Sequence, residues 1–366
     1  MIAVLIFLLL LSYDFFVALL IIGWNKLIAS PPPLENRQNQ MISVIVPARN
    51  EEHRIGNLLR SLAAQQYRNF ELVVVDDHST DETNRIVREF GLSNLRLFKN
   101  NGEGKKAAIT QGVSQARSEW IVTTDADCEV SPGWLTGIST YLADESTKML
   151  IGGVRMSNKP SFFAALQSLE FASLIGSGAS ALALGSPVMC NGANLVFRKS
   201  VFEEVEGYSG NTHIPSGDDE FLMRKVHARY PEGLKFLSIS QTVVTTQPQA
   251  TVSDFFHQRI RWAGKWQANS SVVASLLAVY IFTVQFSVVL AWVMLITQGT
   301  GRLIGIALIL KAIIELIFFV PVCRFLQVRW HTVAFVILQI IYPLYVISVA
   351  LTSLFSSYRW KGRTYQ

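Results

Sequence analysis

Charged residues are scarce in this chain of 366 residues: they make up 16% of it, whereas hydrophobic residues make up 50%. Soluble domains carry about 25% charged residues, so the composition excludes an ordinary soluble enzyme and predicts membrane-spanning segments. Cysteine is also rare, since only Cys128, Cys190 and Cys323 are present and no two have C-x-x-C spacing. This argues against a disulfide framework or a zinc site and fits a reducing cytosolic face.

The net charge is +5, which favours binding of nucleic acid, anionic lipid or a phosphorylated substrate. No stretch interleaves basic residues with aromatic ones in a stripe. Nucleic acid is therefore not expected as a partner, and membrane lipid and a phosphorylated substrate are.

Four apolar stretches are long enough to cross a bilayer. Residues 1–24 form the first, because about 20 apolar residues span a hydrocarbon core of about 30 Å. A cleaved signal peptide is the alternative, but the stretch lacks a basic leader and is long. The other predicted spans are residues 271–297, 303–322 and 332–355. Residues 25–40, which include three consecutive prolines, are predicted to be a stiff polar linker.

These spans predict an integral protein of the plasma or inner membrane with a cytosolic catalytic domain. That orientation puts Arg324 and Arg329 in the cytosol, as basic loops prefer. Three spans after the domain would place the basic tail on the other side, at Arg359, Lys361 and Arg363. Either the tail departs from the tendency or one stretch is re-entrant, and Pro343 makes the last stretch the candidate.

Between the first and second spans, residues 41–265 alternate strand-like and helix-like segments. The expected strands cover residues 43–47, 71–75, 95–98 and 120–124. This alternation predicts an α/β fold with a mostly parallel sheet and right-handed crossovers. Residues 161–176 are apolar and run into a Gly/Ser-rich segment. They are interpreted as an interfacial helix near an acceptor lipid, with an ordinary core helix as the alternative.

Acidic residues follow two of these strands. Asp125 and Asp127 come after residues 120–124, and Asp76 and Asp77 come after residues 71–75. Open α/β sheets bind ligands at the carboxyl edge of their strands, and neighbouring carboxylates repel each other unless a cation is present. Mg²⁺ or Mn²⁺ suits carboxylate oxygens and substrate phosphates, so a metal–diphosphate site is predicted here.

Further polar segments surround that edge. A carboxylate at Asp76 or Asp77 can accept a hydrogen bond from a uracil imide or a ribose hydroxyl. The segment after the first strand can close over a base through Pro47, Ala48, Arg49 and Glu51. Lys105 opens a predicted helix, where free N–H groups favour phosphate. The glycines before it fit a dinucleotide-binding pattern only weakly, and they do not form a Walker A loop.

Two clusters lie further along the chain. Asp218 and Asp219 with Glu220 place three acids on one helical turn, so at least one is expected to meet a metal or to act as a base. The second cluster comprises Gln258, Arg259, Arg261 and Trp262. Its arginines can offset the charge of a leaving diphosphate, and its tryptophan offers a ring for stacking. A juxtamembrane basic cluster with an interfacial aromatic residue is the alternative.

Together these motifs resemble the family 2 glycosyltransferases with a GT-A type domain. The resemblance is carried by residues 46–51, 75–81, 104–105, 124–127, 191–194, 217–220 and 258–262. It implies that Asp76 or Asp77 holds uridine, that Asp127 with Asp125 binds the metal–diphosphate, and that Asp219 is the catalytic base. Gln258, Arg259, Arg261 and Trp262 are implied to hold diphosphate and acceptor. The base motif usually reads Glu-Asp, so Asp218 remains the alternative base.

The expected reaction is an inverting transfer from a nucleotide sugar, UDP-linked, to a membrane-associated acceptor such as a lipid hydroxyl. A processive polysaccharide synthase is the alternative, because its Gln-Arg-x-Arg-Trp motif is similar. A transporter or receptor with a nucleotide-sensing domain is the alternative of another class. Lys311 and Glu315, spaced to pair on one helical face, would then be pathway residues; otherwise they are structural.

Overall fold

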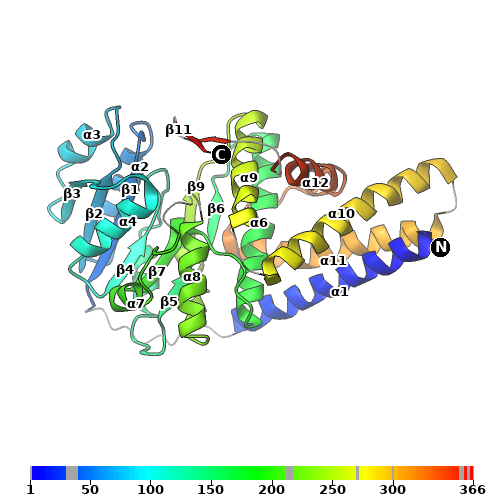
Figure 1. Ribbon diagram of the computed structural model, residues 1–366, viewed down its shortest axis with the longest axis horizontal. Coiled ribbons are helices and arrows are strands. Elements are labelled where there is room, and N and C mark those ends of the chain that lie inside the picture. The colour runs from blue at the N-terminus through cyan, green and yellow to red at the C-terminus, as the bar shows by residue number, and fades with distance from the viewer. Residues whose placement is uncertain are drawn as a thin grey trace. The chain divides into compact units, whose positions relative to one another are not determined.

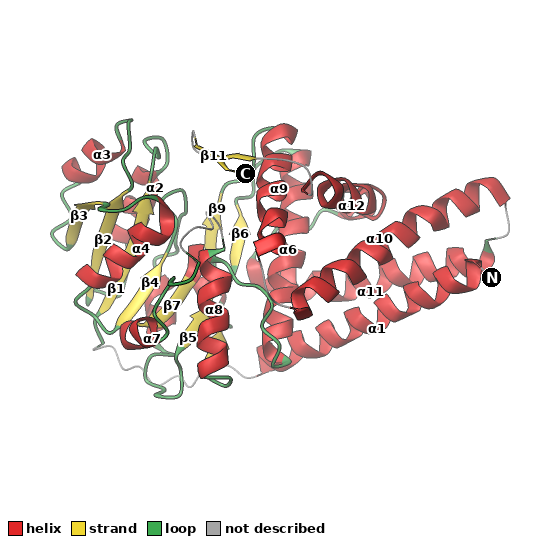
Figure 2. Ribbon diagram, in the orientation of Figure 1, coloured by secondary structure: helices red, strands yellow, loops and turns green. Residues whose placement is uncertain are grey.

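The computed structural model describes residues 2–29, 40–211, 217–268, 272–298, 301–353, 358–360 and 363–365. The chain forms two compact units, each continuous in space but not in sequence. The sheet unit comprises Lys26–Ser157 and Ala181–Gln247. The helical unit comprises Met1–Asn25, Asn158–Ser180 and Pro248–Gln366. Figure 2 distinguishes their helices, strands and loops by colour.

The sheet unit is built on seven strands in the order β3-β2-β1-β4-β7-β5-β8. Their bounds are β1 Ile42–Ala48, β2 Phe70–Asp76, β3 Leu95–Lys99, β4 Trp120–Thr123, β5 Met149–Ile151, β7 Leu195–Arg198 and β8 Leu234–Phe236. All neighbouring pairs are parallel except the two that β7 makes, with β4 and β5. The predicted α/β fold with a mostly parallel sheet is confirmed. A smaller parallel pair joins β6 (Val154–Met156) to β9 (Val244–Thr246).

Hydrophobic patterning explains why these segments form a layered core. Every residue of β2 and β4 is buried, as expected for strands covered on both faces. Helix α2 (Ile55–Ala63) buries Ile55, Leu58, Leu59 and Leu62, which share one helical face. The other helices of the unit are α3 Thr83–Glu89, α4 Gly104–Gln115, α5 Trp134–Ser139, α7 Lys199–Glu204 and α8 Asp218–Arg229. Figure 1 shows α4 lying against the β1–β2 part of the sheet.

Four helices of the helical unit are long and apolar enough to cross a membrane. They are α1 Ile2–Ala29, α10 Val272–Gln298, α11 Arg302–Leu326 and α12 Thr332–Ser353. Helix α1 continues past the predicted end at Trp24, so the first residues of the predicted linker, 25–29, are helical. Most of the rest of that linker, residues 30–39, lies outside the described residues. The unit also contains α9 (Val252–Ala268) and the β10–β11 hairpin, Tyr358–Trp360 with Arg363–Tyr365.

The apolar helix predicted at residues 161–176 is longer than expected: α6 runs from Phe162 to Ala183. Its Gly/Ser-rich second half stays helical because the small residues permit close packing against α11. A Cβ atom on Gly176 would lie 2.7 Å from a methyl carbon of Val322 and 3.2 Å from the ring of Phe318. Small residues at a helix crossing serve the same purpose in membrane proteins generally.

This packing predicts that Gly176→Ala destabilises the protein although alanine favours helices. The added methyl group overfills the contact, which typically costs about 1–3 kcal/mol. Gly305→Ala in α11 is the matched control, because a Cβ there meets nothing within 4 Å. Thermal unfolding in detergent should give a lower Tm for Gly176→Ala and an unchanged or higher Tm for Gly305→Ala. Equal melting temperatures for the two variants would contradict the close crossing.

Candidate active site

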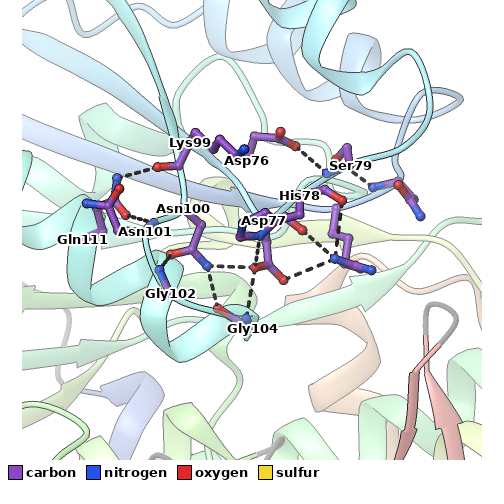
Figure 3. A network of polar contacts seen from close by, with 12 residues as sticks. Asp76, Asp77, His78, Ser79, Lys99, Asn100, Asn101, Gly102, Gly104 and Gln111 are labelled. Atoms are coloured by element: carbon purple, nitrogen blue, oxygen red, sulfur yellow. Dashed lines mark hydrogen bonds and ion pairs between the residues drawn. The ribbon is translucent and has the colours of Figure 1, made fainter.

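Asp77 lies just beyond the carboxyl end of β2 and fixes the start of α4 (Figure 3). Its Oδ1 atom accepts hydrogen bonds from Asn100 Nδ2 at 2.8 Å and from the backbone N–H of Gly104 at 3.0 Å. The other carboxylate oxygen lies 3.9 Å from a guanidinium nitrogen of Arg49. The carboxylate therefore caps the positive end of a helix, which sets the position of the lysine that follows Gly104.

The segment after β1 is joined to the same edge. Strand register places Ala48 opposite Asp76 and Pro47 opposite Val75. The carbonyl of Ala48 accepts from the backbone N–H of Asp77 at 2.7 Å, and the Arg49 side chain donates to the carbonyl of Asp77 at 2.7 Å. The two predicted nucleoside-binding segments thus lie side by side.

Asp76 and Glu51 are both buried beneath these loops. The carboxylate of Asp76 accepts from the backbone N–H of Ser79 and from Asn84, each at 3.3 Å. The backbone N–H of Glu51 donates to Thr83 Oγ1 at 2.7 Å. These bonds tie the loop after β1 to the start of α3.

Lys105 is the link between two acidic motifs that are distant in sequence. Its Nζ atom lies 2.7 Å from Asp125 Oδ1, beyond β4, and 3.4 Å from Asp218 Oδ2, on α8. Burial alone would lower the pKa of Lys105, but the two carboxylates hold that pKa well above its ordinary value. The ammonium group consequently keeps its charge at neutral pH.

Asp219, beside Asp218 on α8, is held differently. Its Oδ2 atom accepts from the backbone N–H of Gly192 at 3.0 Å, and the carbonyl of Gly192 accepts from Thr123 Oγ1 at 2.9 Å. A Cβ atom on Gly192 would stand 3.1 Å from Asp218 Oδ2 and 3.2 Å from Lys105 Nζ. Gly192 is therefore a site residue that the sequence analysis quoted in a motif but did not assign.

Asp127 lies 3.7 Å from a guanidinium nitrogen of Arg54. Arg54, half exposed at the start of α2, was not singled out from the sequence. No local sequence pattern identifies Arg54 as a partner of Asp127, because the two residues belong to loops that come together only in the folded sheet unit.

The donor set around Asp125 and Asp127 fits a metal that arrives with a diphosphate. Among the described residues, no group of three or more His, Cys, Asp or Glu side chains is placed to hold an ion. Mg²⁺ commonly takes only one or two protein carboxylates and completes its shell with substrate phosphates and water. The carboxylates of Asp125 and Asp127 are therefore enough protein ligands for such an ion.

The Gln258–Trp262 motif lies on α9 in the helical unit. Arg259 is 3% exposed and forms a bidentate ion pair with Glu170 of α6. It also donates to Gln258 Oε1 at 2.7 Å and lies 4.2 Å from the ring centre of Trp262. Burial opposes the charge, yet Glu170 raises the pKa of Arg259. Arg259 thus anchors α9 to α6, and Glu170 is a partner that the sequence did not reveal.

Of the predicted residues in the sheet unit, Asp77, Lys105, Asp125 and Asp218 are joined through Gly104 by hydrogen bonds and ion pairs. Asp127 pairs instead with Arg54, and Asp219 accepts from the backbone of Gly192. Arg261 and Trp262 lie on the same helix as Arg259, in the other unit, and are partly buried.

The chain is similar in sequence to two bacterial enzymes that are named as synthases. The poly-beta-1,6-N-acetyl-D-glucosamine synthase of Staphylococcus epidermidis is 26% identical over 241 residues, which cover 63% of this chain and 55% of the relative. The enzyme of the same name from Staphylococcus aureus (strain COL) is 28% identical over 239 residues, covering 63% and 56%. The chain therefore spans about half the length of these relatives.

A solved structure resembles the chain over nearly its whole length. It is described as mannosyltransferase PcManGT from Pyrobaculum calidifontis in complex with GDP-Man and Mn²⁺, with a TM-score of 0.61 at 19% identity. The match covers 97% of this chain and 99% of that one. The GT-A type fold implied by the sequence is confirmed by this likeness. The model of glycosyl transferase family 2 matches residues 43–206 of this chain.

Proposed function

We propose that the protein transfers a sugar, with inversion, from a nucleotide sugar to a hydroxyl group of a membrane-held acceptor. The observation that carries the proposal is the contact of Lys105 with Asp125 and Asp218 at the carboxyl edge of the sheet. It places a fixed positive charge beside two carboxylates from different motifs, which suits a diphosphate leaving group next to a proton acceptor.

The nucleoside lies over the loops after β1 and β2 in this proposal. Asp76 or Asp77 accepts from the base or the ribose, while Pro47, Ala48, Arg49 and Glu51 form the wall beside it. The expected donor is UDP-linked, as the family resemblance implies. The Pyrobaculum mannosyltransferase was solved with GDP-Man, so GDP is the alternative nucleotide to compare in binding experiments.

The diphosphate is expected to contact Lys105, with Arg54 at its edge. Asp127 and Asp125 would hold Mg²⁺ or Mn²⁺, and the Mn²⁺ described with the Pyrobaculum protein supports a divalent ion. When bound, the ion neutralises charge that develops on the leaving diphosphate. Lys105 and Arg54 pair with Asp125 and Asp127 in the structure, so these cations are already located where the diphosphate is expected.

Asp219 is proposed as the base that takes the proton of the attacking hydroxyl. Asp218 is the weaker candidate, because its Oδ2 atom is already engaged by the ammonium group of Lys105 at 3.4 Å. The backbone N–H of Gly192 orients Asp219 at 3.0 Å. The hydroxyl oxygen attacks the anomeric carbon as the bond to the diphosphate breaks.

The acceptor is proposed to be a lipid hydroxyl in the cytosolic leaflet, because the motif of residues 258–262 lies on a helix packed among apolar helices. A growing polysaccharide is the second candidate. It is favoured by the synthases that the chain resembles.

Lys105→Met is predicted to weaken binding of UDP about tenfold to a hundredfold. A hydrogen bond to a charged group contributes about 1.5–3 kcal/mol, and methionine keeps the apolar stem. Isothermal titration calorimetry measures the affinity. The control is Lys99→Met, an exposed lysine at the end of β3; similar affinities for the two variants would rule out a phosphate contact by Lys105.

Asp127→Ala is predicted to abolish the part of nucleotide binding that depends on a divalent ion. Titrations of UDP with Mn²⁺ and with a chelator should differ for the wild type and coincide for the variant. Glu129→Ala, two residues further on, is the control. An Mn²⁺-dependent gain in affinity that persists in Asp127→Ala would reject the metal site.

Asp219→Asn is predicted to abolish transfer while UDP-sugar binding stays within about twofold, because the amide keeps the shape but cannot accept the proton. Asp218→Asn should instead change binding, since it removes a partner of Lys105. Radiolabelled sugar transfer and calorimetry on the same preparations separate the two roles. Equal loss of binding and transfer in Asp219→Asn would mean that it is not the base.

The whole proposal is tested by incubating membranes that contain the protein with UDP-sugars and measuring release of UDP. Release that depends on Asp219 identifies an enzyme, whereas binding without release identifies a sensor. Mass spectrometry of the lipid extract then separates a glycolipid product from a polymer.

A further inference from the structure

We propose that α12 does not cross the membrane: it lies within the leaflet on the catalytic side and returns the C-terminal tail to that side. Length and composition alone class α12 with the spanning helices. Its placement within the helical unit differs from theirs.

Helices α1, α10 and α11 define the direction of the bundle and its two ends. At one end, here called the far end, a buried cluster joins Ile6 and Leu10 of α1 to Val288 and Ala291 of α10 and to Ile304 and Ala307 of α11. At the other end, the near end, the ring of Trp24 on α1 lies 5.5 Å from that of Phe325 on α11. Helix α10 starts at the near end, directly after α9, and its second half joins the far-end cluster.

Helix α12 begins at the near end and runs in another direction. In Figure 1, α1, α10 and α11 extend along the plane of the view, while α12 is strongly foreshortened and runs across them. Membrane-spanning helices tilt by about 20° on average, within a range of about 0–40°. A helix that runs across its neighbours is not a fourth parallel span.

The contacts of α12 keep its second half near α6 and α9. Tyr345 donates to Glu170 Oε1 of α6 at 3.4 Å, and its ring lies 5.4 Å from that of Phe255 on α9. Earlier in the helix, Gln339 donates to Glu315 Oε2 at 2.8 Å, in the middle of α11. The helix therefore packs against the middle of α11 at Gln339 and against α6 and α9 at Tyr345, and it also packs against α10.

The chain after α12 is also back at the near end. Strand β10 contacts α9, and only five residue steps separate Ser353 from Tyr358. Five residues reach at most about 18 Å, whereas a 25-residue helix such as α11 is about 37 Å long. The end of α12 is therefore too close to α9 to lie at the far end.

The exposed face of α12 is suited to contact with lipid acyl chains. The exposed side chains along it are apolar at Val333, Val336, Ile340, Leu344 and Leu351, while its polar Gln339 and Tyr345 point into the protein. Basic residues flank the helix in the sequence, at Arg324 and Arg329 before it and at Arg359, Lys361 and Arg363 after it. With α12 in one leaflet, all five stay on the catalytic side, where basic segments meet anionic headgroups.

Three conservative cysteine variants of the full chain test this arrangement. Ser93→Cys marks the sheet unit, Thr297→Cys marks the far end of α10 and Thr364→Cys marks the tail. The parent carries Cys190→Ser and serves as the labelling blank, since Cys128 and Cys323 are buried. Sealed vesicles of both orientations are treated with a membrane-impermeant maleimide.

We expect Ser93→Cys and Thr364→Cys to react from the same side, and Thr297→Cys from the opposite side, each with at least a tenfold excess over the other orientation. If Thr364→Cys reacts from the side of Thr297→Cys, α12 crosses the membrane and the proposal is wrong. If Ser93→Cys and Thr297→Cys share a side, the bundle does not span and the proposal also fails. Labelling does not depend on transfer activity, so this result is independent of the proposed reaction.

Discussion

The ammonium group of Lys105 is the charge on which the arrangement of the site depends. Asp125 and Asp218 belong to motifs about ninety residues apart, and two buried or half-buried carboxylates repel unless a cation lies between them. Lys105 contacts both, at 2.7 and 3.4 Å. It is held there because Asp77 caps the first turn of its helix, so the loop after β2, which is proposed to bind the nucleoside, is joined to the acidic cluster.

A second buried ion pair, between Arg259 and Glu170, holds two helices of the helical unit together. Arg259 and Glu170 are both nearly inaccessible, and removing one partner of such a pair costs about 3–5 kcal/mol because the other charge is left unpaired. The pair joins α6 to α9, and Tyr345 of α12 adds a hydrogen bond to the same glutamate. Within the motif of residues 258–262, one arginine therefore supports the helix, which leaves Arg261 as the arginine proposed for the diphosphate or acceptor.

The sequence predicted the sheet well and the helical unit less well, for physical reasons. Buried strands such as β2 are read directly from an apolar run that ends in acids, and α2 from the spacing of its leucines. The extent of α6 was missed because Gly176 disfavours a helix locally and is explained only by its contact with Val322. The sequence did not predict the roles of Arg54, Gly192 and Glu170. Their contacts, with Asp127, Asp219 and Arg259 respectively, form only when distant segments fold together, and no local sequence pattern indicates them.

The edge of the sheet around Lys105 is proposed to bind the diphosphate of a sugar nucleotide. An experimental structure with UDP and Mn²⁺ tests it most directly, because manganese is located by its anomalous scattering. We expect manganese bound to Asp127, a phosphate oxygen within hydrogen-bonding distance of Lys105 Nζ, and an intact hydrogen bond from the Gly104 N–H to Asp77. Density for the diphosphate away from Lys105 and Asp127 would contradict it.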